Sequence, residues 1–131
     1  MKTLITGGSG LVGSALVEYL FIKGHTIQCL KRPQQVDSDH FWATDKLPEN
    51  PDSKYQTIVH LAGENVAQGR WTPKKKQQIL ISRLKGTKEL IDYVSMLKEK
   101  PNLFLSASAI GYYGSRGDEI LDKIVQWAMV F

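Results

Sequence analysis

Hydrophobic and polar positions follow one another along this chain with the spacings of strands and helices. Residues 3–6 form a β-prone run that stops at the glycine-rich stretch 7–10. Over residues 11–23 the apolar positions recur at helical spacing, namely at 12, 15, 16, 19 and 20. Gly24 is placed to end that helix, and residues 26–30 have the composition of a second strand. The pattern predicts a strand, a glycine turn, a helix and a strand within about 30 residues, which is a βαβ unit.

The rest of the chain continues the alternation of strands and helices. Residues 58–62 and 103–105 are compact apolar runs of the kind found in buried parallel strands, and a further short strand is expected within 40–44. Thr72 and Pro73 are typical first residues of a helix, which the pattern extends to about residue 98. The predicted apolar face of this helix consists of Leu80, Leu84, Thr87, Ile91 and Val94. Strands that alternate with helices imply a parallel sheet with right-handed crossovers.

Composition and charge exclude several classes of protein. The 131 residues suffice for one domain, and 42% hydrophobic with 23% charged residues is ordinary globular usage. A single cysteine, Cys29, rules out a disulfide-stapled scaffold and favours a cytoplasmic location. No apolar run approaches the roughly 20 residues of a membrane span, and glycines interrupt any signal peptide. The net charge of +4 is mild, and the three lysines 74–76 lack a reader motif, so we expect neither a membrane nor a nucleic acid as partner.

The strongest chemical signal is the glycine turn after the first predicted strand. Gly7, Gly10 and Gly13 recur at every third position between that strand and the predicted helix. An early glycine permits the tight turn, Gly10 lets the backbone approach a pyrophosphate, and Gly13 lets the helix pack closely on the strand. The free N–H groups and positive dipole of a helix start then favour a diphosphate. The spacing and its context predict a dinucleotide-binding site.

The end of the second predicted strand bears on the choice of dinucleotide. A site specific for NAD has a carboxylate there, which accepts hydrogen bonds from the ribose 2′-hydroxyl. This chain has Lys31 and Arg32 instead, and the next acid is Asp37. An arginine can hold the 2′-phosphate of NADP, which a carboxylate would repel. We therefore expect NADP rather than NAD; the alternative is that Lys31 and Arg32 are a solvated basic pair.

These motifs and several others occur in a familiar order. The sequence resembles the extended short-chain dehydrogenase/reductase superfamily, within it the NADP-type epimerase-like subgroup of the NAD-dependent epimerase/dehydratase family. The matching segments are 5–13, His60-Leu61-Ala62-Gly63-Glu64, Arg70-Trp71-Thr72, Ser82-Arg83-x-x-Gly86-Thr87, Ser106-Ala107-Ser108-Ala109 and Gly111-Tyr112-Tyr113-Gly114. The resemblance implies an α/β fold with a Rossmann-like, doubly wound parallel sheet, here truncated after about the fifth strand. It also implies a dinucleotide-binding domain over 1–122, followed by an unrelated apolar tail over 123–131.

The resemblance assigns roles to individual residues. Implied cofactor contacts are Gly7, Gly10, Leu11, Val12, Gly13, Lys31, Arg32, Leu61, Ala62 and Arg83, with a plain surface arginine as the alternative for Arg83. Ser108 resembles the superfamily serine that hydrogen-bonds the reacting carbonyl or hydroxyl, and Ser106 is the competing assignment. No metal site is expected, because the histidines lack ligand spacing.

The chain also departs from the superfamily pattern. Catalysis there normally uses a tyrosine with a lysine four residues later. Positions 116 and 117, four residues after Tyr112 and Tyr113, hold Arg116 and Gly117. Two readings follow: an NADP-dependent epimerase/dehydratase-like oxidoreductase acting on a small molecule such as a nucleotide sugar, or a non-catalytic dinucleotide-binding or self-associating remnant. With few predicted helices to cover the sheet, we also expect a homo-oligomer.

Overall fold

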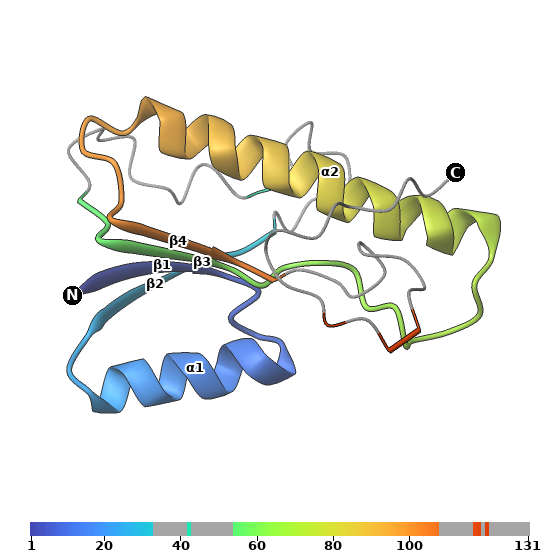
Figure 1. The fold of residues 1–131 in the computed structure, drawn as a ribbon, viewed down its shortest axis with the longest axis horizontal. Coiled ribbons are helices and arrows are strands. Elements are labelled where there is room, and N and C mark those ends of the chain that lie inside the picture. The colour runs from blue at the N-terminus through green and yellow to red at the C-terminus, as the bar shows by residue number, and fades with distance from the viewer. Residues whose placement is uncertain (33–41, 43–53, 108–116, 119, 121–131) are drawn as a thin grey trace.

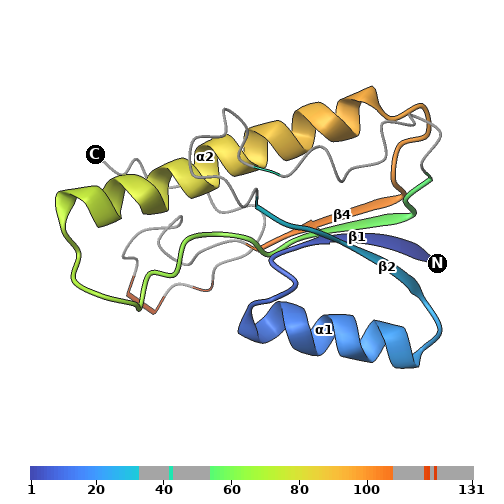
Figure 2. The ribbon, with the colours of Figure 1, turned by 180° about the vertical axis from the view of Figure 1, so that it is seen from behind.

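The computed structural model describes residues 1–32, 42, 54–107, 117–118 and 120. The described strands are β1 (Lys2–Thr6), β2 (Thr26–Leu30), β3 (Thr57–His60) and β4 (Leu103–Ser106); the helices are α1 (Leu11–Ile22) and α2 (Pro73–Met96). The strands are parallel and form one sheet in the order β2-β1-β3-β4. Figures 1 and 2 show α1 on one face of this sheet and α2 on the other. This is the α/β, Rossmann-like architecture that the sequence predicts.

The helix boundaries follow from local chemistry. Gly24, with φ 76°, ends the α1 segment in the left-handed conformation that glycine tolerates. Thr72 caps α2, because its Oγ1 accepts a hydrogen bond from the Lys75 N–H at 3.2 Å, and proline stands at the first helical position. Both helices therefore begin where the sequence predicts.

β3 ends two residues before its predicted end at residue 62. The Leu61 N–H still donates to the Thr6 carbonyl oxygen at 3.1 Å. The Ala62 N–H instead donates to the Thr6 side-chain Oγ1 at 3.3 Å. The chain thus leaves the strand ladder at residue 61, and a side chain of β1 replaces the backbone as its partner. The strand expected within 40–44 and the tail 123–131 lie outside the described residues, apart from Trp42.

The core lies between the sheet and α2. Leu4, Ile58 and Leu90 are fully buried there, and Trp42 is 2% exposed. Leu4 and Ile58 are register partners on β1 and β3, so they point to the same face of the sheet. Phe104 of β4 packs against the same cluster. The strands are thereby fixed against one long helix.

The face of α2 that packs is not the face predicted from the sequence. Leu80, Leu84 and Ile91 are 57%, 64% and 46% exposed, so that part of the prediction is wrong. The buried residues are Ser82, Gly86 and Leu90, while Thr87 is half-buried and Val94 packs against the core. Small residues are buried on this face because the Trp42 indole packs directly against the helix. Its Nε1 donates to the Gly86 carbonyl oxygen at 2.7 Å.

The face of the sheet that carries α1 is less completely covered. α1 packs through Gly13, whereas Val12 and Tyr19 of its predicted apolar face are 66% and 58% exposed. Leu103 and Leu105 of β4 alternate with Phe104 and so point to this face. They are 47% and 48% exposed. Apolar side chains therefore remain in contact with solvent on the α1 side.

Candidate functional site

The glycine turn brings β1 and α1 into close contact. Gly7 has φ 76°, and its carbonyl oxygen accepts a hydrogen bond from the Gly10 N–H at 3.0 Å. A Cβ atom at position 13 would lie 2.1 Å from that same oxygen. The first turn of α1 can therefore press against the turn only because residue 13 is glycine.

The start of α1 is suited to an anion. Gly10 is the N-cap and contributes no side-chain hydrogen bond, and no acidic residue stands in the first turn of this helix, all of which the structure describes. N–H groups at such a start lack intrahelical partners, and the helix dipole is positive at this end. A phosphate or diphosphate is the ligand that such a terminus favours.

A cavity of about 740 Å³ opens beside this turn. The glycine turn, the end of β2 and the loop after β3 form its wall. Its lining residues are Gly7, Gly8, Ser9, Gly10, Cys29, Leu30, Lys31, Arg32, Trp42, Leu61, Ala62, Gly63, Glu64, Asn65 and Gln68. The volume lies within the usual range of cofactor pockets. Elements far apart in the sequence thus meet at the carboxyl ends of the strands, where open α/β sheets bind ligands.

The structure brings six of the predicted cofactor residues into this wall: Gly7, Gly10, Lys31, Arg32, Leu61 and Ala62. Leu11, Val12 and Gly13 are not among the lining residues but form the first turn of α1 next to it. Ser108, Tyr112 and Tyr113 lie outside the described residues. Ser106 is the last residue of β4, exposed, and opposite His60 in the strand register.

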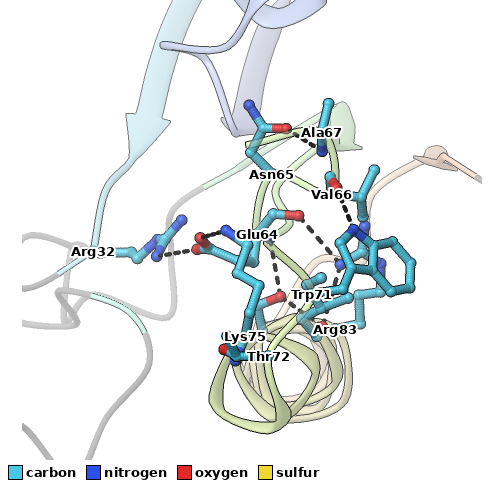
Figure 3. Close-up of polar contacts among 11 residues, drawn as sticks. Arg32, Glu64, Asn65, Val66, Ala67, Trp71, Thr72, Lys75 and Arg83 are labelled. Carbon is cyan, nitrogen blue, oxygen red and sulfur yellow. Dashed lines mark hydrogen bonds and ion pairs between the residues drawn. The ribbon is translucent and has the colours of Figure 1, made fainter. Parts of the chain in front are cut away.

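Glu64 links the segment after β2 to the first turn of α2, as Figure 3 shows. Its Oε2 lies 3.4 Å from Arg32 Nη1, at the end of β2, and its Oε1 lies 2.7 Å from Lys75 Nζ, in the first turn of α2. The hydrogen bond from Lys75, with the nearby Arg32 charge, holds the pKa of Glu64 below its usual value. A carboxylate therefore stands beside the arginine that the sequence assigns to a 2′-phosphate.

Arg83 supports this loop. Its Nη1 donates to the Glu64 carbonyl oxygen at 3.4 Å and to the Ile79 carbonyl oxygen at 3.2 Å (Figure 3). Arg83 is not among the lining residues; its Nη1 contacts the backbone of Glu64, which lines the cavity, and that of Ile79 within α2. A direct contact of Arg83 with a cofactor stays a prediction.

His60 connects three elements beneath the cavity. Its Nδ1 lies 2.7 Å from Thr6 Oγ1 of β1, and its Nε2 lies 2.9 Å from Thr87 Oγ1 of α2. The Trp42 ring meets it edge-on, with the ring centroids 6.2 Å apart. Burial lowers the pKa of His60, because the charged imidazolium is poorly solvated there. His60 is thus a neutral structural link at the edge of the sheet that carries the site.

Sequence reasoning missed Glu64, Lys75 and Trp42 as residues of the site. Glu64 stands in a motif singled out above, but nothing in the sequence shows that it meets Arg32. Lys75 belongs to the lysine run 74–76, which was considered only as a nucleic-acid patch and set aside for want of a reader motif. In the part of the chain that the structure describes, no three His, Cys, Asp or Glu side chains cluster as metal ligands do. Neither of the two described helices combines the length and apolarity that a membrane crossing needs.

Comparison with known proteins gives consistent results. The sequence model of the "NAD dependent epimerase/dehydratase family" matches residues 3–125. An epimerase family protein of Staphylococcus haemolyticus is 39% identical over 116 residues, which is 84% of this chain and 38% of that protein. The chain thus spans well under half the length of this curated relative.

Two solved structures share the fold. A human epimerase family protein crystallised with NADPH is 27% identical, with a TM-score of 0.70 over 86% of this chain and 38% of the human chain. A nucleoside-diphosphate sugar epimerase from Corynebacterium glutamicum is 33% identical, with a TM-score of 0.61 over 92% of this chain and 25% of its own.

Proposed function

Because the chain belongs to the NAD dependent epimerase/dehydratase family, we propose that it binds NADP in the cavity at the glycine turn. The reaction class that we propose is that of an epimerase/dehydratase-like oxidoreductase acting on a small molecule. The observation that carries the proposal is the close approach of Gly13 to Gly7, which leaves the uncapped start of α1 beside a cavity of cofactor size. The diphosphate would lie against the N–H groups of Leu11 and Val12, because the Gly10 N–H already donates to the Gly7 carbonyl oxygen.

The preference for NADP rests on the end of β2. Lys31 and Arg32 both line the cavity, so a 2′-phosphate on the adenosine ribose would meet two cationic side chains. Arg32 is bent toward Glu64 across the cavity wall, which argues against the alternative of a solvated pair pointing away from the site. Leu61 and Ala62, on the loop opposite, would line the adenosine.

The nucleotide would supply and accept a hydride, whereas the protein binds and orients the reactants. Ser108 follows the last residue of β4 by two positions in the sequence. We assign it the hydrogen bond to the substrate oxygen, with Ser106 as the competing residue. A nucleotide-linked sugar is the substrate class that we favour, since a similar structure is that of a nucleoside-diphosphate sugar epimerase.

A second candidate function is dinucleotide binding without turnover. The observation that favours it is the absence from the sequence of a lysine four residues after Tyr112 or Tyr113. Without that lysine, neither tyrosine has the partner that lowers its pKa for acid/base work.

Calorimetry with NADP and NAD tests the binding proposal. We expect tighter binding of NADP, and we expect Arg32→Ala to reduce the difference, with Lys31 still present, while NAD binding persists. Lys23→Ala removes one positive charge at the far end of α1 and is the matched control. Equal affinities in the unaltered chain would contradict the preference for NADP.

An absorbance assay with sugar nucleotides distinguishes the two candidate functions. The second candidate predicts dinucleotide binding without hydride transfer, because no lysine stands four residues after Tyr112 or Tyr113. Turnover that is lost in Ser108→Ala but kept in Ser106→Ala would instead establish the oxidoreductase and the assigned serine.

A further inference from the structure

We propose that Glu64 is a specificity-determining residue, whose carboxylate competes with the 2′-phosphate of NADP for Arg32 and so narrows the preference for NADP over NAD. This inference rests on the proposed function, because it concerns the same cavity. It starts from an observation that dinucleotide motifs do not include: the acid absent from the end of β2 is replaced in space by one from the loop after β3.

The backbone of Glu64 is held in place. Its N–H donates to Ser82 Oγ at 2.9 Å, and Ser82 is only 3% exposed. Its carbonyl oxygen accepts from Arg83 Nη1 at 3.4 Å. Both bonds come from α2, so this part of the loop is tied to the helix and the Glu64 side chain starts from a fixed point.

Lys75 directs the carboxylate. Its ammonium group is 2.7 Å from Oε1, and the Lys75 side chain is only 14% exposed. The Lys75 backbone is in turn fixed by the Thr72 cap of α2. With Oε1 taken by Lys75, the other oxygen, Oε2, faces Arg32. Glu64 is ionised near neutral pH, and the hydrogen bond from Lys75 lowers the pKa of its carboxyl further below that range.

The contact with Arg32 is the weaker of the two. The nitrogen and oxygen are 3.4 Å apart, and the Arg32 side chain is 54% exposed, so solvent screens their attraction. A 2′-phosphate carries more negative charge than a carboxylate and three acceptor oxygens, so it can take Arg32 from Glu64. Binding of NADP then breaks the Arg32–Glu64 ion pair and brings the 2′-phosphate close to the Glu64 carboxylate. Binding NAD leaves the pair intact, and its 2′-hydroxyl can donate to a carboxylate, as in NAD sites.

The experiment measures dissociation constants of NADP and NAD by calorimetry at one ionic strength. The variants are Glu64→Gln, the control Glu18→Gln and the unaltered chain. Glu18 is exposed on α1 and does not line the cavity, so its replacement makes the same change in net charge elsewhere. We expect Glu64→Gln to raise the preference for NADP over NAD by about twofold to fivefold, the range of an exposed ion pair. Glu18→Gln should leave the preference unchanged.

A double substitution makes the test specific to Arg32. In an Arg32→Ala background, Glu64→Gln should raise the preference by a smaller factor than in the unaltered chain, because the competition for Arg32 is gone and only the direct effect of the carboxylate on the 2′-substituent remains. Glu64→Asp, which keeps the charge but shortens the side chain, covers the case that the glutamine variant does not fold. Glu64→Asp should raise the preference for NADP over NAD by a smaller factor than Glu64→Gln.

Each outcome has one meaning. An unchanged or lower preference for NADP in Glu64→Gln overturns the inference, and so does an equal gain for both dinucleotides. In those cases the proposed function stands, because the unaltered chain still binds. If the unaltered chain binds neither dinucleotide, the proposed function is overturned together with the inference.

Discussion

A methyl group at position 13 has no room, because its carbon would lie 2.1 Å from the Gly7 carbonyl oxygen. We expect Gly13→Ala to lower the free energy of unfolding by roughly 1–3 kcal/mol, despite the better helix propensity of alanine. We also expect it to abolish dinucleotide binding, since α1 must move away from the turn. Urea denaturation and calorimetry measure the two effects.

Gly24→Ala is the control for that substitution. Gly24 also has a positive φ, of 76°, but a Cβ there meets nothing within 4 Å. The backbone strain in Gly24→Ala should lower the free energy of unfolding by about 1 kcal/mol and leave dinucleotide binding intact. Equal losses of binding in both variants would show that the close approach of Gly13 is not what shapes the site.

His60 should make the stability of the protein depend on pH. Burial lowers its pKa in the folded chain, so the unfolded chain binds the proton more readily. The stabilisation is fully present above the unfolded value of about 6.5 and declines as the pH falls through that value. Free energies of unfolding measured at about pH 7.5 and about pH 5.5 should therefore differ more in the native chain than in His60→Gln.

The glutamine variant also reports on the hydrogen bonds of His60. At neutral pH, His60→Gln should lower the free energy of unfolding by about 1–3 kcal/mol. The reason is that the Thr6 and Thr87 hydroxyls lose their hydrogen bonds to the imidazole. The same pH dependence in both proteins would mean that other groups carry it.

Residues of the site could be predicted from the sequence where the local backbone conformation requires a particular residue type. Gly7 and Gly13 follow from spacing alone, since the turn and the close approach are both local. Glu64 was not predictable, because its partner Arg32 stands 32 residues earlier. A pair of this kind arises only when two loops meet at the end of a sheet.

At the scale of elements, the packing of α2 gives a direct test of which face is buried. Leu90 is 0% exposed and Leu84 is 64% exposed. We expect Leu90→Ala to lower the free energy of unfolding by about 2–5 kcal/mol and Leu84→Ala to lower it by less than about 0.5 kcal/mol. Thermal and urea unfolding of the two variants measure the difference. Similar losses at both positions would restore the face predicted from the sequence.

The ends of α2 could be predicted, whereas its orientation could not. Thr72 and Pro73 determine the start through a cap and a missing N–H, both of which are local. The orientation depends on Trp42, which donates to the Gly86 carbonyl oxygen from a distant segment. Apolar residues at 80, 84 and 91 follow helical spacing equally well, so periodicity alone favoured the wrong side.

At the scale of the whole molecule, the exposed apolar side chains on the α1 side lead us to expect self-association. Leu103 and Leu105 are about half exposed, and Val12 and Tyr19 are exposed on α1. Burying apolar surface against a second copy contributes about 25 cal/mol per Å². Light scattering over a concentration series should show a mass that rises above 14.7 kDa.

Substitutions on the two faces of the sheet can identify the surface through which the chain self-associates. Replacing both Leu103 and Leu105 with lysine should shift the protein toward the monomer, whereas Leu84→Lys, on the α2 side, should not. Deleting residues 123–131 shows whether the predicted apolar tail takes part. A monomer at every concentration, with or without the tail, would contradict self-association.

The strand order also has a consequence for the time course of folding. β1 precedes the other described strands in the chain, yet it lies inside the described sheet and pairs with β3, 54 residues later. During synthesis the first strand can pair with β2 alone, and its second edge stays open until β3 has left the ribosome. Closing so long a loop is slow, and an open edge invites pairing with other chains. We therefore expect β1, the strand that leads into the glycine turn, to be exposed to aggregation in the nascent protein until β3 has been made.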